Sequence, residues 1–203
     1  NYSTSSSFTN TTTFPENYWA VTSITGDNGM TGPHALSSAS TLAYENGLFD
    51  AVSQEFRGYG KVTETRPDGS KAVHIFHQDD AKKGREESST LMDAQNAPYL
   101  AAVNLWTSSL SDGIQTVRLE KSEEYTYDGV LPNPKITKTE YKNFDSYGNA
   151  GLEVDYGDIA VTGDETYIYR EFVYNPDLWI VNKVKHSYIT AVENGTKLRE
   201  SWF

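Results

Sequence analysis

The sequence contains no cysteine, which excludes disulfide bonds, thiol nucleophiles and zinc sites built on thiolates. It also has no run of basic residues, and 17 Lys and Arg against 28 Asp and Glu give a net charge of −11. A surface for nucleic acid or for an anionic membrane is therefore not expected. No apolar run approaches the roughly 18 residues of a membrane span, so we expect a soluble chain without membrane insertion.

Helical periodicity is scarce, whereas strand-forming residues are abundant. Hydrophobic residues make up only 37% of the chain, but 13% are aromatic, including 14 Tyr and 4 Trp. Such a chain is too aromatic to be disordered, and aromatic and β-branched residues favour strands. Segments with a period of two residues recur over 114–127, 134–144, 151–156, 165–174, 179–192 and 196–203. The sequence predicts an all-β protein, an antiparallel meander of long twisted β-hairpins with little or no helix.

Turn formers set the expected ends of these strands. Residues 66–69, Arg-Pro-Asp-Gly, predict a tight turn between two β-rich segments, because Pro presets φ and Gly accepts a positive φ. A strand over 37–44 is expected to end at a turn over 45–47, Glu-Asn-Gly. Residues 86–93 and 100–107 are predicted as strands rather than helix, because neither keeps an apolar period of 3.6 residues.

Two groups of residues resemble one known family. The first is the run Phe56, Arg57, Gly58, Tyr59 and Gly60, then Phe76, His77 and Gln78, then Lys83, Gly84 and Arg85. The second is a turn with Phe144, Asp145, Gly148 and Asn149, with a truncated copy at Tyr127, Asp128 and Gly129 and a weaker echo over 174–177. Together they resemble the middle region of the Tc insecticidal toxin B component and the SpvB-like proteins of the Rhs/YD-repeat superfamily.

The resemblance implies a structural role. In that family the segment lies between a β-propeller and a long spiral of β-hairpins that closes into a shell around a toxic C-terminal polypeptide. It implies a non-enzymatic shell or scaffold segment without cofactors, secreted or at the cell surface as part of a larger protein. Its partners would be the propeller and further YD repeats of the same polypeptide, and other toxin-complex subunits. Residues 1–17 would be a flexible Ser/Thr/Asn-rich tail, 18–55 an N-terminal β segment, and 56–203 the YD/Rhs-like hairpin region.

The second motif also has a physical rationale of its own. An aromatic ring at Phe144 can cover the end of a hairpin, while the Asp145 carboxylate can accept backbone N–H groups in an Asx-turn. Gly148 supplies a positive φ, and Asn149 tolerates such a φ or adds a hydrogen bond. We therefore expect this unit to close hairpins.

Histidines and carboxylates offer few signs of catalysis. In a strand over 71–76, His74 and His77 would lie on opposite faces, roughly 10 Å apart along the axis, too far to share one zinc ion. A pair of His77 with Asp79 is conceivable, although we interpret His77 as a histidine at a strand end. His34 and His186 are interpreted as structural. No catalytic or metal-binding residue is therefore predicted.

The sequence offers residues for two further kinds of site. Calcium could bind the loop at 26–29 or the carboxylates of Asp155 and Asp158, but neither matches an EF-hand loop, and ordinary turn residues are favoured. Tyr125, Tyr167 and Tyr169 could stack on sugars, which leaves a carbohydrate-binding or adhesive β module at the cell surface as the alternative function. Cross-strand packing of these tyrosines is the favoured interpretation.

Overall fold

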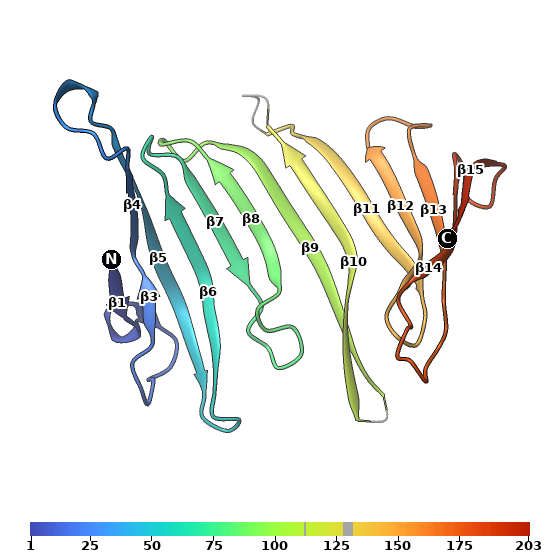
Figure 1. Cartoon of the computed structure of the whole chain (residues 1–203), viewed down its shortest axis with the longest axis horizontal. Helices are drawn as coiled ribbons and strands as arrows, with labels where there is room; N and C mark the ends of the chain where they lie inside the picture. The colour runs from blue at the N-terminus through green and yellow to red at the C-terminus, as the bar shows by residue number, and fades with distance from the viewer. Residues whose placement is uncertain (112, 128–131) are drawn as a thin grey trace. The chain divides into compact units, whose positions relative to one another are not determined.

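The structure is a computed structural model that describes residues 1–111, 113–127 and 132–203. The chain divides into two compact units, unit 1 over residues 1–101 and unit 2 over residues 102–203. Strands account for nearly all of its regular structure, and the described residues contain only two short 3-10 helices besides them. No helix among these residues is long and apolar enough to cross a membrane. The predicted all-β class is confirmed (Figure 1).

Unit 1 is built on four long strands that follow one another as antiparallel neighbours. Its elements are β1 (Tyr2–Thr4), η1 (Ser5–Ser7), β2 (Thr9–Asn10), β3 (Trp19–Val21), β4 (Ser23–Asp27), η2 (Gly32–His34), β5 (Ser37–Asp50), β6 (Glu55–Thr65), β7 (Lys71–Phe76) and β8 (Glu86–Met92). Strands β5 to β8 pair in sequence order, as a meander requires. The predicted turn joins β6 to β7, where Gly69 has a φ of 83° and its N–H donates to the carbonyl of Arg66 at 2.9 Å.

Unit 2 continues the same pattern. Its strands are β9 (Pro98–Ser111), which begins in unit 1, β10 (Ile114–Thr126), β11 (Lys135–Phe144), β12 (Ala150–Asp158), β13 (Thr166–Phe172), β14 (Val184–Thr190) and β15 (Lys197–Trp202). Each of β10 to β14 pairs with the next strand in an antiparallel register. The region 86–107, where helix was the competing prediction, forms β8 and most of β9.

The turn predicted over 45–47 is wrong, because β5 continues through these residues to Asp50. Asn46 has a φ of 58°, and the pairing with β6 shifts register just after Gly47, so the segment forms a β-bulge. A Cβ on Gly47 would lie 2.3 Å from Oδ1 of Asn10 and 2.8 Å from the ring of Phe14. The Asn-Gly pair thus forms a bulge within β5 instead of a turn, and Gly47 allows neighbouring side chains to pack closely.

The first 17 residues contain more order than an irregular tail. Strand β1 pairs with β3, and β2 pairs in parallel with β5. The rings of Phe8 and Phe14 pack on Tyr44, Tyr59 and Phe56 at centroid distances of 5.1 to 5.7 Å. Burial of these aromatic rings explains why a stretch rich in Ser and Thr lies against the sheet.

The predicted boundary at residue 55/56 falls at the start of β6, whose partner is β5. These two strands form one hairpin. Thr41 pairs with Thr65 at its open end, and Asp50 pairs with Glu55 next to the turn. The contacts therefore do not separate residues 18–55 from the segment that follows, and the division between compact units lies at residue 101/102. The division into residues 1–17, 18–55 and 56–203, with a YD/Rhs-like region last, stays a prediction.

The hydrophobic core of unit 2 is small. Leu152 and Val154 on β12 are 2% and 1% exposed, and their register partners on β13 are Tyr169 and Tyr167. In unit 1 the buried hydrophobic residues of the described part are Phe49 and Ala72. Most of the stability must therefore come from strand pairing and from partly buried aromatic side chains.

Replacing Leu152 by Ala should lower the free energy of unfolding by about 2–4 kcal/mol, because a fully buried side chain leaves a cavity behind. Urea unfolding followed by tryptophan fluorescence measures this loss. Leu198→Ala is the matched control, since Leu198 is 69% exposed and its removal should cost under about 0.5 kcal/mol. Equal losses in the two variants would contradict the burial described.

Candidate functional site

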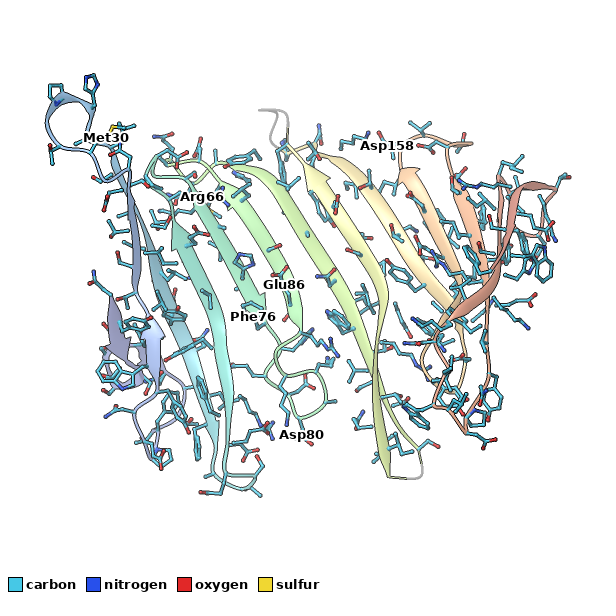
Figure 2. All side chains as sticks on the ribbon, viewed as in Figure 1. Met30, Arg66, Phe76, Asp80, Glu86 and Asp158 are labelled. Carbon is cyan, nitrogen blue, oxygen red and sulfur yellow. The ribbon has the colours of Figure 1, made fainter. Side chains whose placement is uncertain are left out.

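The motif residues of unit 1 meet at one end of the sheet, where the β5–β6 hairpin lies beside the loop from 77 to 85. Arg57 on β6 is central: its Nη2 donates to Oδ1 of Asp80 at 3.0 Å and forms an ion pair with Asp50. Its Nη1 donates to the carbonyl of Gln78 at 3.3 Å. The Arg57 side chain is only 12% exposed. Figure 2 shows Asp80 in the loop between β7 and β8, at the opposite end of these strands from Arg66.

Gln78 forms the second part of this arrangement. Its Nε2 donates to the carbonyls of Asn46 on β5 and Gly58 on β6, at 2.8 and 2.9 Å. Nζ of Lys83 lies 2.5 Å from Oε2 of Glu55 at the start of β6. We call Arg57, Gln78 and Lys83 with these partners the hairpin tie of unit 1, because it joins one hairpin end to the loop of the next hairpin.

Two glycines of the motif permit this tie, Gly60 by the space that it leaves and Gly58 by its positive φ. A Cβ on Gly60 would lie 2.8 Å from Oε1 of Gln78, so a larger residue would displace the glutamine. Gly58 has a φ of 85°, in the left-handed region that other residues avoid, and its carbonyl accepts the bond from Gln78. The loop is closed by backbone bonds from the N–H of His77 to the carbonyl of Arg85 and from the N–H of Gly84 to the carbonyl of His77. Phe76 is the last residue of β7.

Hydrogen bonds and charges shift the pKa values of two groups of the tie. The backbone N–H of Val52 lowers the pKa of Asp50, and Ser53 and the Arg57 guanidinium lower it further. The Glu55 carboxylate, by its hydrogen bond and charge, raises the pKa of Lys83. Both shifts favour the charged forms of Asp50 and Lys83.

The histidines do not converge on a metal site. Nδ1 of His74 lies 2.7 Å from Oε2 of Glu86, whereas His77 lies beyond the end of β7. Nδ1 of His77 is 3.8 Å from the carboxylates of Asp79 and Glu87, which is too long for a hydrogen bond. No group of three metal-ligating side chains occurs among the residues that the structure describes.

The turn between β11 and β12 has the Asx geometry that its sequence suggests. Oδ1 of Asp145 accepts the N–H groups of Tyr147 and Asn149, both at 2.9 Å. Gly148 has a φ of 85°, and its N–H donates to the carbonyl of Asp145 at 3.1 Å. The ring of Phe144 lies 5.2 Å from the guanidinium carbon of Arg118. Of the truncated copy, Tyr127 follows the end of β10, while Asp128 and Gly129 lie outside the described residues.

Two turns of the same kind were missed by the sequence analysis. Between β8 and β9, Oδ1 of Asp93 accepts the N–H groups of Gln95 and Ala97, at 2.9 and 2.8 Å. Asn96 has a positive φ of 66° and lies three residues after the Asp, the position that Gly148 has in its own turn. After β5, Oδ1 of Asp50 accepts the N–H of Val52 at 2.8 Å. An Asp at the end of a strand, with Asn or Gly three residues later, is a sequence signal that could have predicted the turn at Asp93.

The β11–β12 turn is also tied to the next hairpin. Nδ2 of Asn149 donates to the carbonyl of Val181, in the segment between β13 and β14, at 2.7 Å. Oη of Tyr147 donates to Oη of Tyr174 at 3.2 Å, and the ring of Trp179 lies edge-on to Tyr147 at 6.2 Å. We call these contacts the hairpin tie of unit 2. Each unit therefore contains an amide side chain that bridges two consecutive hairpins.

Of the tyrosines considered for sugar stacking, Tyr169 and Tyr125 have partners within the protein. Tyr169 stacks on Tyr188 of β14 at 4.6 Å with an interplanar angle of 8°, and its Oη accepts the N–H of Asn194. Tyr125 donates to Oε2 of Glu123 at 3.0 Å. Tyr167 shares the face of Tyr169, and burial raises its pKa. These contacts favour the packing interpretation.

The loops considered for calcium use their oxygens internally. Oδ1 of Asp27 accepts the N–H of Gly29, and Oδ1 of Asn28 accepts that of Leu36. Asp155 and Asp158 each accept a backbone N–H two residues later, at 3.0 Å. These are the bonds of ordinary turns.

The remaining histidines have different settings. His34 is the last residue of η2, in an exposed loop. His186 is buried on β14, where its Nε2 lies 2.7 Å from Oε1 of Glu200 and its ring stacks on Trp202 at 3.8 Å. His186 thus packs β15 against β14.

Glu140 on β11 is a carboxylate with three donors close to it. It accepts hydrogen bonds from Lys138 at 3.0 Å and from Tyr156 at 2.8 Å, and Nζ of Lys142 lies 2.8 Å away. Burial alone would raise the pKa of Glu140, but these three donors outweigh it and lower the pKa to about 2. The carboxylate is therefore ionised in the folded state even in mild acid.

No protein-family model matches the chain, and no curated protein matches it. Solved structures do match in fold. A crystal structure of TcdB2-TccC3-Cdc42 matches with a TM-score of 0.59 and 13% identity, covering 75% of this chain. A crystal structure of TcdB2-TccC3 matches with a TM-score of 0.59 and 14% identity, over the same share. The structure of a Photorhabdus luminescens Tc holotoxin pore matches with a TM-score of 0.59 and 13% identity, again over 75% of this chain.

This chain spans only 12% of each of those matched chains. At such low identities the likeness concerns the fold alone. The chain therefore has a Tc-toxin-like fold over three quarters of its length.

Arg57→Ala should lower the free energy of unfolding by about 2 kcal/mol, because it leaves Asp50 and the carbonyl of Gln78 without their shared donor. Arg199→Ala is the control: Arg199 is exposed on β15, so its loss should cost under about 0.5 kcal/mol. Urea denaturation of both variants measures the difference. A value for Arg57→Ala as small as the control would show that the tie contributes nothing to stability.

Glu140→Gln should be less stable than the wild type near neutral pH, and the deficit should shrink in acid. A carboxylate with a folded pKa of about 2, against an ordinary 4.5, stabilises the fold above that ordinary value and loses this contribution as the pH falls toward 2. Unfolding free energies at about pH 6 and about pH 3 measure the change. Glu124→Gln, at an exposed site on β10, should change stability little at either pH. A deficit for Glu140→Gln that stays constant in acid would contradict the account.

Proposed function

We propose that this chain is a non-enzymatic structural segment, a piece of shell or scaffold, of a large Tc/Rhs-type secreted toxin that encloses or delivers a C-terminal effector. The observation that carries the proposal is the fold likeness to the TcdB2-TccC3 structures, at a TM-score of 0.59 over 75% of the chain. The run from Phe56 to Arg85 and the turn at Phe144 to Asn149 support the same family independently, because they were identified from sequence.

The small core supports a role within a larger body. A sheet normally buries at least one face against a second layer. Here the buried hydrophobic residues of the described chain are Phe49, Ala72, Leu152 and Val154, while large side chains such as Leu110 are exposed. In the proposed toxin, other segments of the same long polypeptide, the propeller and further YD repeats, would cover part of this surface, and other toxin-complex subunits could also contact it.

In the proposed toxin, the last described strand would gain a further neighbour. Within the described residues, β15 pairs with β14 on one edge, and no strand pairs with its other edge. An unpaired edge with exposed Leu198 and Trp202 is a site where a further strand can add. In a spiral of hairpins the next repeat would fill this edge.

The two hairpin ties give the motif residues a structural role in this proposal. Gln78 and Asn149 each link one hairpin to another, and Gly60 leaves the space that Gln78 occupies. In a shell built of consecutive hairpins, such links would hold the hairpins together at the strand ends, where the hydrogen bonds between strands stop. We assign no catalytic, cofactor, nucleic-acid-binding or membrane-inserting role to these residues, and we place the segment outside the cell or at its surface.

The competing carbohydrate-binding function gains no support from the tyrosines. The ring of Tyr169 is stacked on Tyr188, and the hydroxyls of Tyr125 and Tyr169 are hydrogen-bonded within the protein. Sugar stacking requires an open ring face.

The proposed function predicts the size of the native polypeptide. An antibody raised against this 203-residue chain should detect, in the source organism, a band several times heavier than the 22.7 kDa of the chain itself. The purified chain on the same blot provides the size control. A native band that comigrates with this control would overturn the proposal, because the chain would then act alone.

A further inference from the structure

Strands β10 and β11 of unit 2 are paired over only part of their length. Their register runs from Lys121 opposite Glu140 to Thr126 opposite Lys135. Residues 114–120 of β10 and 141–144 of β11 lie beyond this paired region, and Figure 1 shows the two strands separating toward the lower end of the view. The sheet therefore opens into a slot between two strands that are neighbours at their other ends.

Each strand is occupied on the edge away from the slot. β12 pairs with β11 down to Phe144 opposite Ala150, and β9 is the other neighbour of β10. On the slot side, no strand in the described part of the chain pairs with residues 114–120. Backbone N–H and C=O groups on such an edge are available to an extended peptide, which can add to the sheet as a strand.

The slot contains a pocket of suitable size. An open cleft of about 500 Å³ lies at the point where the strands separate, and its lining includes Leu105, Tyr141 and Phe144. Leu105 is 47% exposed. The pocket thus offers apolar surface for one or two side chains of an inserted strand.

Arg118 gives the slot its charge preference. Its guanidinium carbon lies 5.2 Å from the centroid of the Phe144 ring, so the side chain reaches from β10 toward β11. Nε of Arg118 is buried without a hydrogen-bond partner. The nearby carboxylates have other donors: Glu120 accepts from Thr107 at 2.9 Å, and Glu140 from Lys138 and Tyr156. A carboxylate from outside would satisfy the guanidinium with charge-assisted hydrogen bonds.

We propose that the slot binds an extended acidic segment of a polypeptide by strand addition. Backbone groups of residues 114–120 pair with the segment, a Glu or Asp of the segment meets Arg118, and an apolar side chain packs against Leu105 and Phe144. β10 is the preferred edge because it offers seven consecutive residues, whereas β11 offers four and is distorted at Asn143, whose φ is 55°. The site does not depend on the proposed function, since it follows from the strands of this chain alone.

The test uses pools of synthetic peptides of about nine residues, blocked at both ends, with Thr alternating with random residues. One pool has a central Glu, a second a central Gln, and a third a central Pro with N-methylated backbone, which cannot pair. Hydrogen exchange of the 203-residue chain is measured by mass spectrometry with each pool. The Glu pool should slow exchange over 114–120, the Gln pool should need about tenfold higher concentration, and the Pro pool should have no effect.

The variant Arg118→Gln should remove the preference for Glu over Gln, while Arg199→Gln, at an exposed arginine on β15, should retain it. The comparison of pools on the wild-type chain holds even if Arg118→Gln fails to fold. Exchange over 114–120 that no pool changes, equal effects of the Glu and Gln pools, or protection confined to β15 would each overturn the proposal.

Discussion

The structure depends on hydrogen bonds that link one β-hairpin to the next at the ends of the strands. Gln78 donates to two backbone carbonyls of the β5–β6 hairpin, and Asn149 donates to a carbonyl of the segment between β13 and β14. In both cases a planar amide reaches groups that the β-ladder leaves unpaired. Backbone carbonyls that the ladder leaves unpaired need other partners, so these amides both satisfy the backbone and link the hairpins.

These links matter because the core is so limited. A protein with few fully buried hydrophobic residues cannot rely on the packing that holds ordinary two-layer domains together. Aromatic pairs across strands, such as Tyr169 on Tyr188, and charged groups such as Glu140 with its donors supply the remaining order. The design suits a sheet whose faces meet other parts of a larger assembly, which is the role proposed here.

The fold class could be predicted because its signals are local. Strand periodicity, the Arg66 turn and the Asx geometry of Asp145 each depend on residues within a few positions of one another. The turn expected at Asn46 and Gly47 was wrong because a residue that accepts a positive φ occurs both in turns and in β-bulges. Only the pairing of β5 with β6 distinguishes the two structures. The order of the first residues depends on the rings of Phe8 and Phe14 meeting Tyr44 and Phe56, which no local pattern reveals.

The candidate site was predictable in its members but not in its contacts. The run from Phe56 to Arg85 was identified through a family resemblance. The hydrogen bond from Gln78 to Asn46, however, depends on the register of several strands, which the sequence does not reveal. The same is true of Asn149 and Val181. The slot between β10 and β11 had no sequence signal, because strand separation reflects where a register ends rather than which residues are present.

The central claim is that this sheet continues into neighbouring segments of a longer polypeptide. Amide hydrogen exchange over β15, residues 197–202, tests it most directly when the isolated chain is compared with the native polypeptide. The account predicts fast exchange in the isolated chain and slow exchange in the native polypeptide, where a further strand pairs with the open edge. Equal rates in both would contradict it, because β15 would then be an edge strand in the native protein as well.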